Sequence, residues 1–310
     1  MKTHINNIVK IILIISVIFG PCAFAHAQEG QDINSFEEGL KLYYQKRFSE
    51  SREFFYEAVS KDPNNTMAMS FYLDASYHCN DLIKTVNALE RKSVEGGNTP
   101  ILKAYVGLAY FTRGLIDRDM LEEARLQFVD ALGKDSSLPI ANCGMGMLYY
   151  QKRLMPRAKG YFLKALSGNP KDLMAMELLG EIIMNEEKDP ATALEYFKTI
   201  IQAEPLYSDG YFYMGSALEK LGKREEAINF YQKCLEIDRN GILKGYDAPT
   251  RIGDIYLKDS NWAEAEKYYK VSLEINPDNA YARTQLEKAR NRGKGWQGEK
   301  YDPLKDKLQK

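Results

Sequence analysis

A short unit, alanine followed four residues later by phenylalanine or tyrosine, recurs along most of this 310-residue chain. The copies begin at alanines spaced 34, 35, 34 and 38 residues apart: Ala124/Phe128, Ala158/Phe162, Ala193/Phe197, Ala227/Tyr231 and Ala265/Tyr269. Ser51/Phe55 is an earlier, weaker copy. A period of this size predicts a stack of similar supersecondary units, because each unit buries its apolar face only against its neighbours.

Two further marks keep the same period. A glycine lies upstream of each copy, at positions 39, 107, 146, 180, 215 and 253, and an apolar residue precedes each of them except Gly39. Leu73 stands where a further glycine is expected. Proline follows the alanine, or its substitute, by 12 residues at Pro63, Pro170, Pro205 and Pro277. Glycine and alanine allow two antiparallel helices to approach closely, and proline begins a new segment. The marks predict seven helix–turn–helix units, of which the second is degenerate.

These marks resemble the tetratricopeptide repeat family, whose pattern is Leu-Gly-x2-Tyr, then Ala-x3-Phe, then Pro. The resemblance covers residues 32–279 and implies an all-α, right-handed superhelical solenoid. We expect repeats at about 32–65, 66–99, 100–138, 139–172, 173–207, 208–245 and 246–279, a capping helix at 280–292 and a basic flexible tail at 293–310. Extra residues near Gly114 to Asp119 and Asn240 to Gly245 predict two loop insertions.

The first 27 residues differ from the rest. Lysines at positions 2 and 10 precede an apolar stretch, Ile11 to Phe19, and Ala25-His26-Ala27 supplies small residues for cleavage before Gln28. We therefore expect a secretory signal peptide, a short linker at 28–31, and a periplasmic or secreted protein. An uncleaved membrane anchor is the alternative. A lipid anchor on Cys22 is disfavoured because proline precedes that cysteine.

Catalytic and cofactor motifs are sparse. Removal of the signal would leave His78 as the sole histidine, too few for a histidine-rich zinc site or a metalloprotease motif. Gly144-Met145-Gly146 belongs to the repeat pattern and has no phosphate-loop continuation. We expect no enzyme activity, cofactor, metal or small-molecule substrate. The alternative is a hydrolase accessory subunit with a site at His78 or in the insertion at Gly114 to Asp119.

Composition excludes further classes of function and of fold. Lys and Arg number 42 against 43 Asp and Glu, and the mixture predicts no nucleic-acid groove. Three cysteines would remain after cleavage, widely spaced, so no disulfide framework is visible. Membrane contact is expected only through the N-terminus or the basic C-terminal tail.

The resemblance also implies which residues line a concave groove formed by the first helices of the repeats. Counted from the glycine as the eighth position, the groove has an apolar, aromatic half and an acidic half. The predicted partner-binding residues are Phe36, Leu40, Tyr43, Tyr44, Leu108, Phe111, Met147, Tyr150, Glu177, Glu181, Phe212 and Asp254. Packing against the adjacent repeat is the alternative role for each aromatic residue.

These features predict an exported scaffold or adaptor. It would hold a peptide or protein segment with apolar side chains at one end and basic ones at the other, in assembly of a cell-envelope or secretion complex. Docking of a chaperone's C-terminal tail is not expected, because no clear repeat has the lysine and asparagine pair that this requires.

Overall fold

A computed structural model describes residues 34–295 of the chain, and these residues form two compact units that meet at Ala175 and Met176. The expected signal peptide, linker and last fifteen residues of the tail lie outside the described residues. Each unit is built only from helices and their connections, so the all-α prediction is confirmed for the part of the chain that the structure describes.

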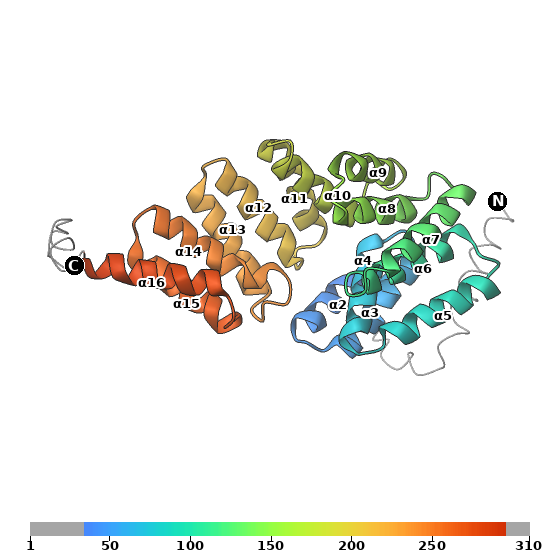
Figure 1. Cartoon of the computed structure of the whole chain (residues 1–310), viewed down its shortest axis with the longest axis horizontal. Helices are drawn as coiled ribbons and strands as arrows, with labels where there is room; N and C mark the ends of the chain where they lie inside the picture. The colour runs from blue at the N-terminus through green and yellow to red at the C-terminus, as the bar shows by residue number, and fades with distance from the viewer. Residues whose placement is uncertain (1–33, 296–310) are drawn as a thin grey trace. The chain divides into compact units, whose positions relative to one another are not determined.

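Paired antiparallel helices make up both units (Figure 1). The first unit contains α2 (Ser35–Tyr44), α3 (Phe48–Lys61), α4 (Thr66–His78), α5 (Leu82–Glu95), α6 (Pro100–Gly114), α7 (Met120–Lys134), α8 (Pro139–Gln151) and α9 (Met155–Gly168). Helix α10 (Leu173–Asn185) begins at its end. The second unit continues with α11 (Pro190–Ala203), α12 (Ser208–Lys220), α13 (Arg224–Ile237), the 3-10 turn η2 (Lys244–Tyr246), α14 (Ala248–Lys258), α15 (Trp262–Ile275) and α16 (Ala280–Gly295). The seven predicted pairs are therefore present.

The periodic glycines allow the two helices of each pair to approach. A Cβ built on Gly107 would lie 2.6 Å from the Phe128 ring, and one on Gly146 would lie 2.5 Å from the Phe162 ring. The same relation holds in four other pairs: Gly39 with Phe55, Gly180 with Phe197, Gly215 with Tyr231 and Gly253 with Tyr269. All six aromatic side chains are fully buried. The glycine and the aromatic residue are thus two halves of one packing contact.

The degenerate second repeat has a particular place in the first unit. Its first helix, α4, packs against α3, α5, α6 and α8. Met67, Met69 and Leu73 of this helix are all 1% exposed or less. The Thr66 hydroxyl donates a hydrogen bond of 2.9 Å to Asp172, which lies 106 residues later at the start of α10. The leucine in place of glycine therefore fills the centre of this unit.

The two insertions differ in how they are built. Residues 115–119 form the turn between α6 and α7, and Leu115 and Ile116 are exposed there. The second insertion folds around Asp238, whose buried carboxylate accepts hydrogen bonds from the backbone N–H groups of Ile242, Leu243 and Gly245 at 2.9, 2.7 and 3.0 Å. It leads directly into η2.

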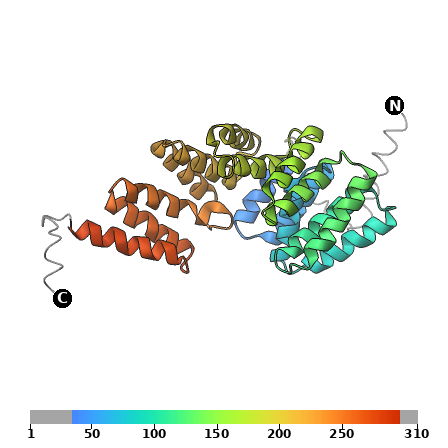
Figure 2. The same ribbon diagram turned by 45° about the horizontal axis from the view of Figure 1, so that its top comes forward.

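The final helix, α16, packs along α15, as both ribbon views show (Figures 1 and 2). It extends to Gly295, three residues beyond the predicted end of the capping helix. Ala282, Leu286 and Ala289 are its buried residues, and they close the cluster around Tyr269. Among residues 34–295, no helix has the length and apolar character needed to cross a membrane.

Candidate partner-binding site

The predicted apolar residues of the first repeat lie in the core of the first unit. Leu40 is 0% exposed and Tyr43 is 2% exposed, and Phe36 and Tyr44 are also buried. The Phe36 ring lies 5.6 Å, centroid to centroid, from Phe71 of α4. These side chains pack against α4, which is the alternative that the sequence left open for the aromatic residues.

In the third and fourth repeats the outcome is mixed. Leu108 and Phe111 of α6 are buried, whereas Met147 and Tyr150 of α8 are partly exposed. The first helices α4, α6 and α8 pack against one another within this unit. Little of the predicted apolar groove is therefore open to a partner here, and only its α8 end has accessible side chains.

In the second unit, Glu177 of α10 is buried and accepts a 2.5 Å hydrogen bond from the Tyr207 hydroxyl. Burial raises its pKa, and the neighbouring charge of Asp209 raises it further. Burial also raises the pKa of Asp209. Glu177 is therefore a buried packing group, and it is not part of the accessible surface.

Glu181 and Phe212 are the partly exposed members of the acidic half. The Glu181 carboxylate accepts a 3.2 Å hydrogen bond from the hydroxyl of Tyr213. The ammonium group of Lys244 lies 5.7 Å from the centre of the Phe212 ring. A cation held over an aromatic face gains electrostatic stabilisation. Lys244 is therefore a cation of the protein itself that occupies part of this acidic site.

Lys244 was not among the residues predicted for the site, although the sequence did indicate the insertion that carries this lysine. Its backbone N–H donates a 2.9 Å hydrogen bond to Asp209. Burial alone would lower its pKa, but nearby carboxylates, Asp209 foremost, raise it above the usual value. A Cβ on Gly245 would lie 2.1 Å from the backbone oxygen of Asp238, so only glycine fits after the lysine. The glycines at 241 and 245 were the signal of a constrained loop.

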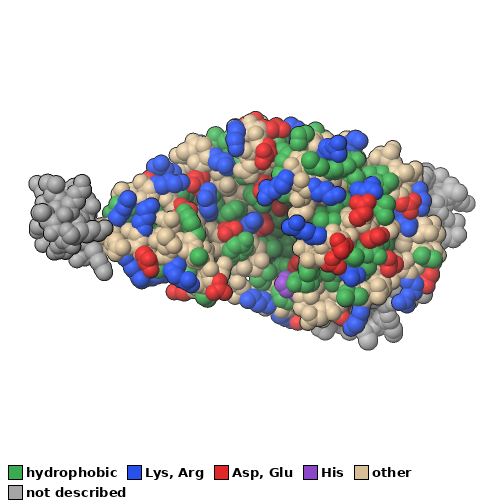
Figure 3. Space-filling model, in the orientation of Figure 1, with side chains coloured by type: hydrophobic (Ala, Val, Ile, Leu, Met, Phe, Trp, Pro, Cys, Tyr) green, Lys and Arg blue, Asp and Glu red, His purple; other side chains and the backbone are tan. Residues whose placement is uncertain are grey.

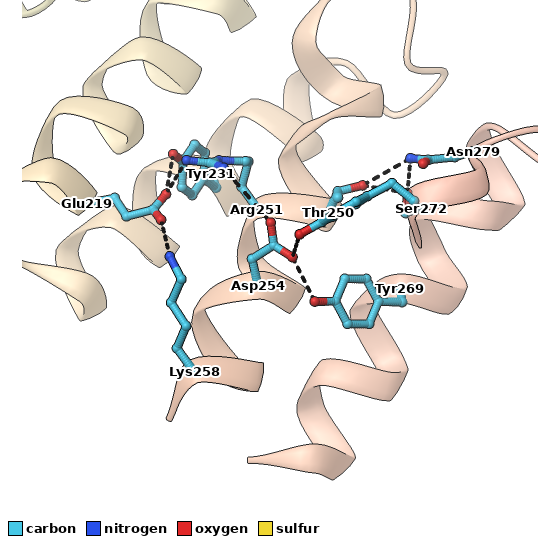
Figure 4. A network of polar contacts seen from close by, with 10 residues as sticks. Glu219, Tyr231, Thr250, Arg251, Asp254, Lys258, Tyr269, Ser272 and Asn279 are labelled. Carbon is cyan, nitrogen blue, oxygen red and sulfur yellow. Dashed lines mark hydrogen bonds and ion pairs between the residues drawn. The ribbon is translucent and has the colours of Figure 1, made fainter. Parts of the chain in front are cut away.

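Asp254 of α14 lies in a polar network that joins the sixth repeat, the seventh repeat and the start of α16 (Figure 4). It accepts hydrogen bonds from the hydroxyls of Tyr269 and Tyr281, at 2.8 and 2.9 Å. Arg251, on the same helix, pairs with Glu219 of α12 at 2.9 Å. Lys258 reaches the other oxygen of Glu219 at 3.1 Å. Neither cation was among the predicted site residues.

The first helices of the second unit thus present a mixed but acidic surface, which we call the acidic face. Its carboxylates are Glu181, Asp209, Glu219, Asp247 and Asp254, and its cations are Lys244, Arg251 and Lys258. Asp209 and Asp254 are buried, whereas Glu181, Glu219 and Asp247 are partly exposed. Arg251 and Lys258 both pair with Glu219, while Glu181 and Asp247 form no ion pair within residues 34–295. Figure 3 shows the same interspersion of both signs on the visible surface. Such a surface favours a ligand with basic side chains.

His78, the alternative catalytic residue, lies at the end of α4. Its ring stacks on Phe48 with centroids 4.2 Å apart, and its Nε2 lies 3.4 Å from a carboxylate oxygen of Asp74. Within residues 34–295 no group of three or more histidine, cysteine or acidic side chains has an arrangement that could hold a metal ion. The histidine's contacts are those of a packing residue at a helix end.

Comparison with known proteins agrees with this architecture. Family models described as tetratricopeptide repeat match residues 208–240 and 250–280, which cover α12–α13 and α14–α15. Anaphase-promoting complex subunit 3 of Schizosaccharomyces pombe is 23% identical over 252 residues, 78% of this chain and 36% of that protein. The chain spans between 12% and 36% of the length of the curated relatives that it matches.

Two solved structures resemble the fold. A chain of the APC/C hetero-tetramer Cut9–Hcn1 superposes with a TM-score of 0.61 at 16% identity, covering 84% of this chain and 49% of that one. YrrB, described as a repeat protein with an unusual peptide-binding site, superposes with a TM-score of 0.50 at 23% identity. That match covers 65% of this chain and 99% of YrrB. At these identities the likeness concerns the fold.

Proposed function

Because this chain is a tetratricopeptide-repeat protein, and so a scaffold for protein–protein interaction, we propose that it binds a basic protein or peptide segment on the acidic face of its second unit. The observation behind this proposal is that the partly exposed carboxylates of Glu181 and Asp247 form no ion pair within residues 34–295, together with the partly exposed ring of Phe212. The ligand would place a lysine or arginine against Glu181 and an apolar side chain against the ring.

Proteins of this fold are typically scaffolds without catalysis, and the packing of His78 gives no support to the hydrolase alternative. The remaining part of the proposal concerns location. The signal-like residues 1–27 support export to the periplasm or beyond, where the protein would act as an adaptor in assembling a cell-envelope or secretion complex. A membrane-tethered organiser with an uncleaved signal is the second candidate.

Binding to the acidic face can be tested with labelled peptides. Fluorescence anisotropy would compare a Lys- and Arg-containing peptide with a peptide in which these residues are glutamine. Glu181→Gln removes a carboxylate and should weaken binding of the basic peptide by about three- to tenfold. Lys244→Gln removes the resident cation and should strengthen it. Glu195→Gln, at an exposed position of α11, is the control for loss of one charge.

Equal affinities for the two peptides, or equal effects of the Glu181 and Glu195 variants, would contradict the proposal. Export is tested separately, by sequencing the N-terminus of protein recovered from the cell envelope. Gln28 at the terminus supports a cleaved signal, and an intact Met1 supports the tethered form.

A further inference from the structure

The fourth repeat differs in charge from every other repeat. Between Asp135 and Asp172 the chain has six Lys or Arg residues and not one Asp or Glu, whereas each other repeat mixes both signs. Five of the six are exposed, and four of these, Lys152, Arg153, Arg157 and Lys164, lie on α9 and in the turn that precedes it. We call these four residues, with Tyr149 and Tyr161, the basic patch. It lies within the first unit.

The cations of the basic patch are not neutralised. Within residues 34–295, none of Lys152, Arg153, Arg157 and Lys164 forms an ion pair with a carboxylate. The charge of Lys152 acts on Glu122 of α7, but the Glu122 carboxylate accepts hydrogen bonds from the Arg125 guanidinium, at 2.6 Å from Nη2 and 2.9 Å from Nε. Some other exposed cations of this unit are paired, as Arg47 is with Glu50.

Two tyrosine rings organise the patch. Tyr149 of α8 and Tyr161 of α9 stack with centroids 5.3 Å apart and planes 12° from parallel. The Arg157 guanidinium lies 5.6 Å from the centre of the Tyr149 ring, and the Lys164 ammonium lies 5.1 Å from the centre of the Tyr161 ring. A guanidinium held against a ring loses little conformational freedom on binding, and it keeps its N–H donors for a planar acceptor.

The spacing of the cations fits a polypeptide. Arg157, Tyr161 and Lys164 lie on one face of α9, and seven residues of helix place the two cations about 10 Å apart along the axis. In a polyproline II segment, which has three residues per turn, two carboxylates three residues apart lie on the same face with a similar separation, about 9 Å. Arginine and tyrosine are also enriched among the residues that dominate protein–protein binding energies.

We propose that the basic patch on α8 and α9 is a docking surface for an acidic segment of a partner protein, with carboxylates at every third residue. A lipid surface is less well matched, because the tyrosine rings face each other and the cations, and so offer little apolar surface for insertion. This surface is distinct in residues and in charge from the acidic face, so the protein would engage two partners of opposite sign.

The test uses the full chain and a labelled twelve-residue peptide with glutamate at every third position. Fluorescence anisotropy at low and at physiological salt should show binding that weakens as salt increases. Arg157→Gln with Lys164→Gln should reduce affinity at least tenfold. The matched control is Lys46→Gln with Arg91→Gln, two exposed positions of the same unit, which should leave affinity within twofold. Tyr161→Leu should weaken binding several-fold, because Lys164 loses its ring.

Circular dichroism before and after each substitution establishes that the surface variants remain folded. Equal binding by the patch variant and its control would overturn the proposal. So would patch-dependent binding of phosphatidylglycerol vesicles or of a DNA oligonucleotide that is tighter than binding of the peptide. Failure of the basic-peptide test on the acidic face would leave this result unaffected, because the two experiments use different ligands and different residues.

Discussion

Replacing Gly107 with alanine tests the packing relation that defines the repeats. The new Cβ would lie 2.6, 2.7 and 3.0 Å from three carbon atoms of the Phe128 ring, and Phe128 is 0% exposed. The ring has no free space into which to move, so α6 and α7 must separate. Overpacking of a core by one methyl group costs about 1–3 kcal/mol. Alanine has a better helix propensity than glycine by about 1 kcal/mol, which offsets part of this cost.

A matched variant separates the two effects. Gly160 is also in the middle of a helix, α9, but it is exposed and its Cβ would meet no atom within 4 Å. Gly160→Ala should therefore stabilise the protein by up to about 1 kcal/mol. Both variants gain the same helix propensity, so the difference between them, about 1–3 kcal/mol, measures the overpacking.

Urea denaturation followed by circular dichroism measures this difference, and a second variant checks its cause. Gly107→Ala combined with Phe128→Leu should recover part of the lost stability, because the smaller side chain makes room for the methyl group. If Gly107→Ala were as stable as Gly160→Ala, the contact between glycine and ring would not define how closely the helices approach, and the reasoning would be wrong.

Three further outcomes follow from the structure. Burial raises the pKa of Asp172 to about 6, so the folded protein binds this proton more tightly than the unfolded chain, and the free energy of unfolding falls as pH rises between about 4 and 6. From pH 5 to pH 8 the protein should therefore lose about 1 kcal/mol of stability, whereas the Asp172→Asn variant should not. Urea titrations of both proteins at the two pH values measure this difference. Asp238→Ala leaves three backbone N–H groups without their acceptor and should lower the free energy of unfolding by about 3 kcal/mol. Hydrogen exchange should become faster only in residues 242–245. Unchanged exchange there would show that the carboxylate does not hold the loop. Leu73→Gly restores the repeat pattern but empties a fully buried site, so it should destabilise by more than about 3 kcal/mol in thermal unfolding, whereas a neutral effect would place the leucine outside the core.

The helices and their pairing were predictable because they depend on short-range pattern. Gly107 and Phe128 are 21 residues apart and belong to one helix pair, so the period alone brings them together. The contact between Thr66 and Asp172 could not be found in this way, since it joins residues 106 positions apart and depends on how successive repeats rotate. Lys244 was missed for a related reason, because an insertion has no equivalent position in the other repeats.

The groove prediction separated an apolar half from an acidic half, but it treated the inner faces of all first helices as accessible, although they differ in burial. Helix α4 has a single carboxylate, Asp74, and no lysine or arginine over Thr66–His78. A helix that is apolar on all sides is buried in a larger core rather than exposed along a groove. Helix α14, by contrast, carries Arg251, Asp254 and Lys258 within eleven residues; Arg251 is partly exposed and Lys258 is exposed, although Asp254 is buried. The number of charged residues on a first helix does not decide this by itself, because α2 carries Glu37, Glu38 and Lys41 and still buries Phe36, Leu40 and Tyr43. The relevant signal is a charged side chain at an inner position that stays partly exposed, as Glu181 does, and binding of a segment should therefore be sought there.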